Sequence, residues 1–218
     1  MRGLEIVSVA LDMHPEDARP FIERAQPNHP SLIDEAQLVD ELLGITNVPN
    51  GVWIDERGMI VRPAEPAFPV RPNYLSAGAQ SRMPPRLAEM LEEAKKIRIE
   101  PEKYVAAVRD WVERGSDSRY ALPPDEVLRR SGTRQAEEAS AAAHFELGQH
   151  LYRRGRVDSA VPHFREAHRL QPDNWTYKRQ AWSLADPLQG PTDLYDSDWL
   201  ADVRRIGAEN YYPPLDMN

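Results

Sequence analysis

Few side chains in this sequence are suited to catalysis or metal binding. The 218 residues contain no cysteine, so thiolate nucleophiles, disulfides and cysteine metal ligands are all excluded. Six histidines are present, but none forms a His-Glu-x-x-His motif, and His163 and His168 are five positions apart. There is no glycine-rich phosphate loop and no Gly-x-Ser-x-Gly elbow. The sequence therefore predicts no catalytic residue, no metal and no cofactor within this chain.

The charged residues also narrow the possible functions. The net charge is −8 and the pI is about 5.3, which argues against nucleic-acid binding. Arg153, Arg154 and Arg156 are interpreted as a solvated helix end, and Asp12 and Asp55 as acids that cap turns. No apolar run approaches the roughly 20 residues that span a membrane. The chain as written is therefore expected in the cytoplasm, unless a targeting segment precedes it.

The first 45 residues show an alternation of strand and helix patterns. Residues 4–11 (LEIVSVAL) have the pattern of a buried strand, and residues 15–26 that of a helix bent at Pro20. Residues 31–33 form a short extended segment. Asp34 then caps a helix that Gly44 ends.

A loop and a hairpin follow this helix. Residues 45–50 contain the Val-Pro pair, and residues 51–55 have a strand pattern. Residues 55–58 (DERG) predict a tight turn, in which Gly58 can adopt a positive φ. Residues 59–62 form the return strand.

This order resembles that of thioredoxin-like proteins of the TlpA/ResA/redoxin type. Residues 44–50 (GITNVPN) are similar to that family's G-V-x-x-V-P-T loop, and residues 53–61 (WIDERGMIV) are similar to its last hairpin. Residues 4–12 correspond to its second strand. The resemblance covers about 60 residues. It implies that Pro49 is in the cis form and that Asn47, Val48 and Pro49 border a substrate groove. Asn50 departs from the threonine usual in the family.

The family's first strand and its active-site helix have no counterpart in the sequence. That strand lies in the middle of the sheet, so its absence leaves unpaired backbone groups on both sides. The flanking strands could collapse together, or a partner could donate a strand. The third alternative, which we favour, is that Met1 is not the biological start. An in-frame UGA codon for selenocysteine upstream of Met1 would then explain the missing motif.

The rest of the chain is predicted to be helical. Proline is concentrated between positions 63 and 85, and residues 67–86 are interpreted as a linker. Helical patterns follow at residues 87–97, 101–113, 124–130, 133–154, 156–170 and 175–184. Trp175 and Trp182 share one helix face and are expected in the core. The aromatic segment 195–214 is expected to pack back on the body of the protein.

Residues 141–174 resemble one tetratricopeptide repeat (TPR). The matching positions are Leu147, Gly148, Ala160, Phe164, Ala167 and Pro172. Their small side chains allow two antiparallel helices to approach, and Phe164 fills the space between them. No second repeat is found, whereas about three are usually needed for independent stability. A helical hairpin packed on the rest of the chain is therefore favoured over a peptide-binding groove.

Together these patterns predict an α/β thioredoxin-like domain, truncated and lacking its first strand and active-site helix, followed by an all-α region. The predicted domains are residues 1–66, the linker 67–86 and the helical region 87–218, which includes the TPR hairpin. The implied function is a thiol-disulfide or peroxide redox protein that is inactive as given. The alternative is a non-catalytic adaptor that uses the TPR hairpin. A protein partner or a second copy is expected to bind the exposed strand 4–11 or this hairpin.

Overall fold

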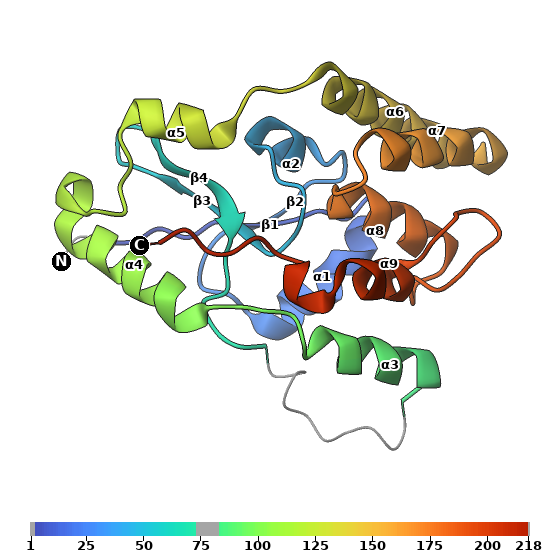
Figure 1. Cartoon of the computed structure of the whole chain (residues 1–218), viewed down its shortest axis with the longest axis horizontal. Coiled ribbons are helices and arrows are strands. Elements are labelled where there is room, and N and C mark those ends of the chain that lie inside the picture. Colours follow the sequence, from blue (N-terminus) through green and yellow to red (C-terminus); the bar gives the residue numbers. More distant parts are fainter. Residues whose placement is uncertain (1–2, 73–82, 218) are drawn as a thin grey trace.

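The computed structural model describes residues 3–72 and 83–217, which form two short strand pairs and a larger helical part (Figure 1). The elements in chain order are β1 (Ser8–Ala10), α1 (Pro15–Ala25), β2 (Ser31–Ile33), α2 (Leu38–Leu43), β3 (Asn50–Ile54), β4 (Ile60–Pro66), α3 (Pro85–Ala94), α4 (Pro101–Arg114), α5 (Pro124–Ser131), α6 (Ala136–Arg153), α7 (Val157–Leu170), α8 (Trp175–Ala185) and α9 (Trp199–Ile206). Short 3-10 turns lie at Gly115–Asp117 and Ala208–Asn210.

The strands form two separate sheets of two strands each. β1 pairs with β2 in parallel, with Ser8 opposite Ser31, whereas β3 and β4 form an antiparallel hairpin. Within residues 3–72 and 83–217, no third strand joins either pair. The two pairs have therefore not collapsed into one sheet. The described part of the chain has a small α/β region, but it does not form a continuous thioredoxin-like sheet.

The predicted buried strand at residues 4–11 is wrong in its extent and in its burial. Only Ser8–Ala10 pairs with another strand. Leu4, Ile6 and Val7 precede the strand and are 44%, 50% and 53% exposed. In the described part of the chain, β1 therefore lies at the edge of its sheet, and the residues before it belong to no strand.

The two helices of this region differ in how well the sequence predicted their ends. α1 has the expected bounds within one residue and contains Pro20. Asp34, however, is not the cap residue of α2, because the helix begins three residues later, after Gln37 in a left-handed conformation. The Asp34 carboxylate instead accepts hydrogen bonds from the backbone N–H groups of Ala36 and Val39, at 3.3 and 2.7 Å. Gly44 ends α2 with φ +68°, as predicted.

The hairpin forms where the sequence predicted it. Gly58 has φ +79°, and the Asp55 carboxylate accepts hydrogen bonds from the backbone of Arg57 and Met59. The return strand is longer than predicted and continues to Pro66. Residues 73–82 of the expected linker lie outside the described residues.

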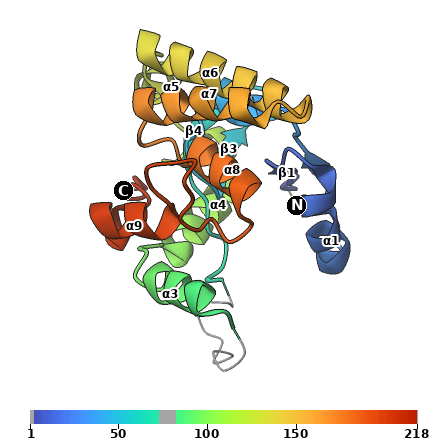
Figure 2. The ribbon, with the colours of Figure 1, turned by 90° about the vertical axis from the view of Figure 1, so that its right-hand side faces the viewer.

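The apolar core consists of two clusters, and neither includes a residue before Trp53. The larger cluster joins α6, α7, α8 and α9 with the C-terminal segment and contains Trp175 and Trp182, as expected. In the smaller one, Trp53 stacks on Trp111 at a ring distance of 5.0 Å, next to Leu215. Among the described residues before position 53, Met13 and Ala18 are the buried apolar side chains, and neither belongs to these clusters. Figure 2 shows β1 and α1 at the outer side of the molecule, away from α9.

The aromatic C-terminal segment packs back on the protein, as the sequence predicted. Tyr195, Trp199, Tyr211 and Tyr212 are all buried, and the Trp199 indole donates to the Tyr211 hydroxyl at 3.2 Å. In the described part of the chain, no helix combines the length and apolarity needed to cross a membrane.

Candidate protein-interaction surfaces

The loop between α2 and β3 holds the residues expected to border a substrate groove. The Val48–Pro49 bond is cis, in agreement with the resemblance. The side-chain amide of the buried Asn47 donates to the Tyr211 carbonyl at 3.0 Å, and the Tyr212 hydroxyl donates to the Val48 carbonyl at 2.6 Å. The C-terminal segment therefore covers one side of this loop. Of the three residues, Asn47 is buried, Val48 is half-buried and Pro49 is exposed.

The same loop also caps the start of α8. The Thr46 carbonyl accepts hydrogen bonds from the N–H groups of Trp175 and Thr176, at 2.7 and 3.2 Å. The Asn174 side chain accepts from the N–H of Tyr177, at 3.2 Å. The first N–H groups of a helix have no partner within the helix, so these contacts satisfy three of them. The two contacts with Thr46 join the α/β region to the helical region.

A buried carboxylate lies beside this junction. Asp40 on α2 is 1% exposed, and burial raises its pKa more than the nearby Thr176 hydroxyl and Glu41 backbone lower it. Burial raises the pKa of Asp40 to about 7, because the charged form loses its hydration. The adjacent Glu41 is satisfied, since it accepts from the Tyr177 hydroxyl at 2.8 Å and pairs with Arg134. Ionisation of Asp40 therefore disfavours the folded state.

The helical hairpin α6–α7 brings most of the predicted TPR positions together. Ala160, Phe164 and Ala167 are at most 1% exposed, and Gly148 is buried against Phe164. A Cβ atom on Gly148 would lie 2.8 Å from the Phe164 ring, so only glycine permits this approach of the two helices. Pro172 is exposed in the turn that precedes α8.

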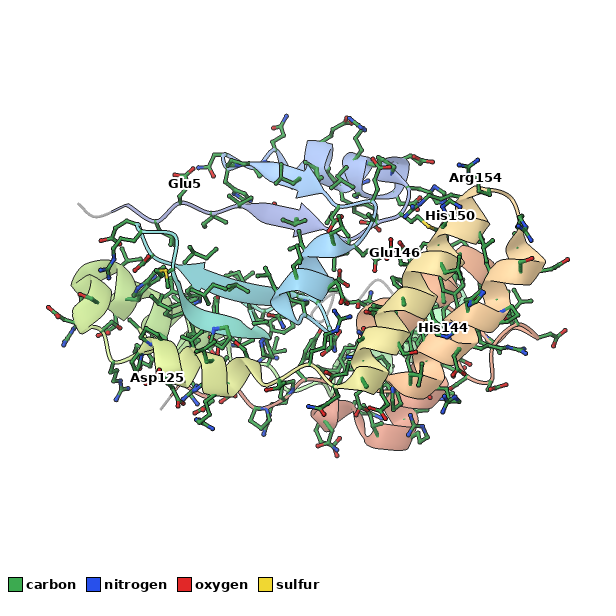
Figure 3. The ribbon with its side chains drawn as sticks, turned by 90° about the horizontal axis from the view of Figure 1, so that it is seen from above. Glu5, Asp125, His144, Glu146, His150 and Arg154 are labelled. Atoms are coloured by element: carbon green, nitrogen blue, oxygen red, sulfur yellow. The ribbon has the colours of Figure 1, made fainter. Side chains whose placement is uncertain are left out.

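Leu147 differs from the other TPR positions because it is 42% exposed. It belongs to a set of exposed residues on the side of α6 opposite Gly148. We call this set the outer α6 face; its members are Ala139, Ala143, Glu146, Leu147 and His150. Figure 3 shows Glu146 and His150 on this side and His144 on the side toward α7. The face combines small and apolar side chains with a polar border, and α6 packs chiefly on α7.

A histidine pair that the sequence did not predict connects the two helices. The Nδ1 atoms of His144 and His163 are 2.9 Å apart, so one imidazole donates a hydrogen bond to the other. The pair is 19 positions apart in the sequence, and only the antiparallel helix packing brings it together. Among the described residues, no group of three or more histidine, cysteine, aspartate or glutamate side chains is arranged to hold a metal ion.

Comparison with known proteins identifies one feature of the chain. Residues 141–174 match the family model of the tetratricopeptide repeat, at the residues that form α6 and α7. No curated protein and no solved structure matches the chain. The comparisons therefore show a single TPR within a helical region, and such repeats generally mediate contacts between proteins.

Proposed function

We propose that this chain is a non-catalytic protein-interaction adaptor and that the outer α6 face binds an amphipathic helix of a partner. The match to the tetratricopeptide repeat supports this proposal. A lone repeat lacks neighbouring repeats to pack on, but here α8 packs against α7 and supplies that surface. The α6–α7 hairpin is thus packed on α8 through α7, and its outer α6 face is exposed.

The observation that carries the proposal is the composition of the outer α6 face. Ala139 and Ala143 allow close approach of a second helix, and Leu147 offers an apolar side chain for its grooves. Glu146 and His150 border this apolar strip with polar groups. Helix-in-groove recognition uses apolar anchors at this helical spacing.

Peptides selected from a library on the full chain test this binding mode. We expect Ala143→Arg to weaken the selected peptides by about tenfold or more, because a long charged side chain blocks the closest approach of the helices. Fluorescence polarisation with labelled peptides measures the change.

The matched control is Ala106→Arg, the same substitution at an exposed position of α4. This variant is expected to bind the selected peptides like the wild type. Equal binding by the wild type and Ala143→Arg, or the failure of any peptide to bind saturably, would contradict a role for the outer α6 face.

A second candidate function is the redox role implied by the thioredoxin-like resemblance. Its support is the arrangement of a parallel pair, a Val-Pro loop and an antiparallel hairpin in the order that the family has. This role requires a thiol or selenol nucleophile, which these 218 residues do not contain.

The DNA sequence upstream of Met1 tests the redox candidate. The redox candidate requires that this DNA encode, in frame, one strand and a cysteine or selenocysteine motif. If the upstream DNA encodes no such segment, the redox candidate is wrong, and the adaptor proposal is unaffected.

A further inference from the structure

The two strand pairs leave one long edge of β1 unpaired. On the paired edge, the N–H of Ser8 donates to the Pro30 carbonyl at 3.0 Å, and the Ala10 carbonyl accepts from the N–H of Asp34 at 2.8 Å. The backbone groups of successive strand residues point to opposite edges. Those of Val7 and Val9 therefore point away from β2. Within the described ranges, no third strand pairs with this edge.

Apolar side chains precede this open edge in the chain. Leu4, Ile6 and Val7, just before β1, are 44%, 50% and 53% exposed, and Ile54 on β3 is 52% exposed. In Figure 3 the two strand pairs lie side by side, with β1 on the side of its pair that faces the hairpin. A two-stranded sheet is only marginally stable in water, and an open apolar edge is a template for pairing with another chain.

The distribution of charge indicates the chemistry of the segment that would pair there. Residues 1–66 contain twelve acidic and five basic side chains, so they carry a charge of −7, whereas the whole chain carries −8. A second copy of the chain would bring the same negative charge to the edge. A segment with lysine or arginine would instead be attracted.

We propose that the open edge of β1 binds an extended segment of a partner polypeptide by strand addition. The segment has alternating apolar side chains, which cover Leu4, Ile6 and Val7, and basic residues at its ends. Its backbone pairs with the free groups of Val7 and Val9. This site is separate from the outer α6 face. It would give β1 and the residues before it, which belong to neither apolar cluster, a partner to pack against.

A lysine-flanked peptide of about nine residues, with alternating valine and threonine, is the probe for this site. We expect saturable binding to the full chain. Val9→Pro is expected to weaken the binding about tenfold, because proline removes an N–H group from the open edge. The β1–β2 pairing is retained, since proline is tolerated where the N–H of an edge strand points outward. Val9→Thr keeps this N–H and is the matched control.

Two further peptides test the same site without altering the protein. A peptide N-methylated at its central residues cannot pair as a strand and is expected to lose binding. A peptide with glutamate in place of lysine is expected to bind about tenfold more weakly at low salt and to lose this difference at high salt. Ala143→Arg is expected to bind the lysine peptide normally, so this test is independent of the outer α6 face.

Three results would overturn the proposal. The first is equal binding of the lysine peptide by the wild type and Val9→Pro. The second is undiminished binding of the N-methylated peptide. The third is a wild-type dimer in solution that Val9→Pro dissociates, because a second copy would then occupy the edge.

Discussion

Replacing Arg62 with methionine is expected to lower the free energy of unfolding by about 3–5 kcal/mol. Arg62 on β4 is 1% exposed, and its Nε donates to Glu65 at 2.5 Å. Its other nitrogens donate to the carbonyls of Tyr120, at 3.0 Å, and Asp216. One side chain therefore joins the hairpin, the segment before α5 and the C-terminal segment.

The expected loss arises from what the substitution leaves behind. Methionine fills much of the volume, but Glu65 and two carbonyls lose their donor in a dry environment. Burial already raises the pKa of Glu65, while Arg62 favours the charged form of that carboxylate. The double variant Arg62→Met/Glu65→Gln also removes the unpaired charge of the Glu65 carboxylate, and it should recover part of the lost stability.

Urea unfolding of the full chain measures these differences. The matched control on the same hairpin is Arg57→Met, because Arg57 is 77% exposed and pairs with Asp55 at 3.3 Å. This surface pair is expected to contribute less than about 1 kcal/mol. If Arg62→Met were as stable as Arg57→Met, Arg62 would not hold these three segments together.

Replacing Asp40 with asparagine is expected to stabilise the protein at pH 8 and to have little effect near pH 4. Burial raises the pKa of Asp40 to about 7 in the folded state, whereas an unfolded aspartate ionises near 3.9. Between these values the folded state holds a proton that the unfolded state has released. Stability from this group is therefore complete below about pH 4 and is lost as the pH rises to about 7.

A pKa difference of this size corresponds to at most about 4 kcal/mol in the free energy of unfolding at pH 8. We expect Asp40→Asn to raise that free energy by about 2 kcal/mol, because the asparagine amide is also buried. Urea unfolding at pH 4.5, 6 and 8 measures the profile. Glu113→Gln removes an exposed carboxylate and is the control. Its difference in stability from the wild type is expected to be the same at the three pH values. A stability gain that is equal at pH 4.5 and pH 8 would show that Asp40 does not titrate as stated.

Local patterns in the sequence predicted most of the elements. Gly44 and Gly58 adopt the left-handed conformations that end α2 and turn the hairpin, because these positions depend on a few neighbouring residues. The spacing of Gly148 and Phe164 likewise predicted how closely α6 and α7 pack. The tetratricopeptide match lies where those residues indicated.

Contacts between distant segments could not be predicted in this way. Nothing in the sequence around Arg62 distinguishes it from an exposed charge on a hairpin. Only the fold brings it into contact with Tyr120 and Asp216. The buried ion pair of Lys178 and Asp202, at 2.7 Å, joins α8 to α9 and has no local signal. Strand burial at residues 4–11 was wrong for the same reason, because composition does not show whether a neighbouring strand is present.

The central claim is that β1 has an open edge to which a partner strand can bind. Hydrogen–deuterium exchange of the full chain tests this claim most directly, when it is measured with and without the lysine-flanked peptide. In the free chain, amides of residues 4–11 should exchange much faster than those of α7 and α8, since only one edge of β1 is paired and none of these residues belongs to the apolar clusters. The peptide should slow exchange at residues 4–11 and leave α6 unchanged. Slow exchange at residues 4–11 in the free chain, or no change on adding the peptide, would contradict an open edge at β1.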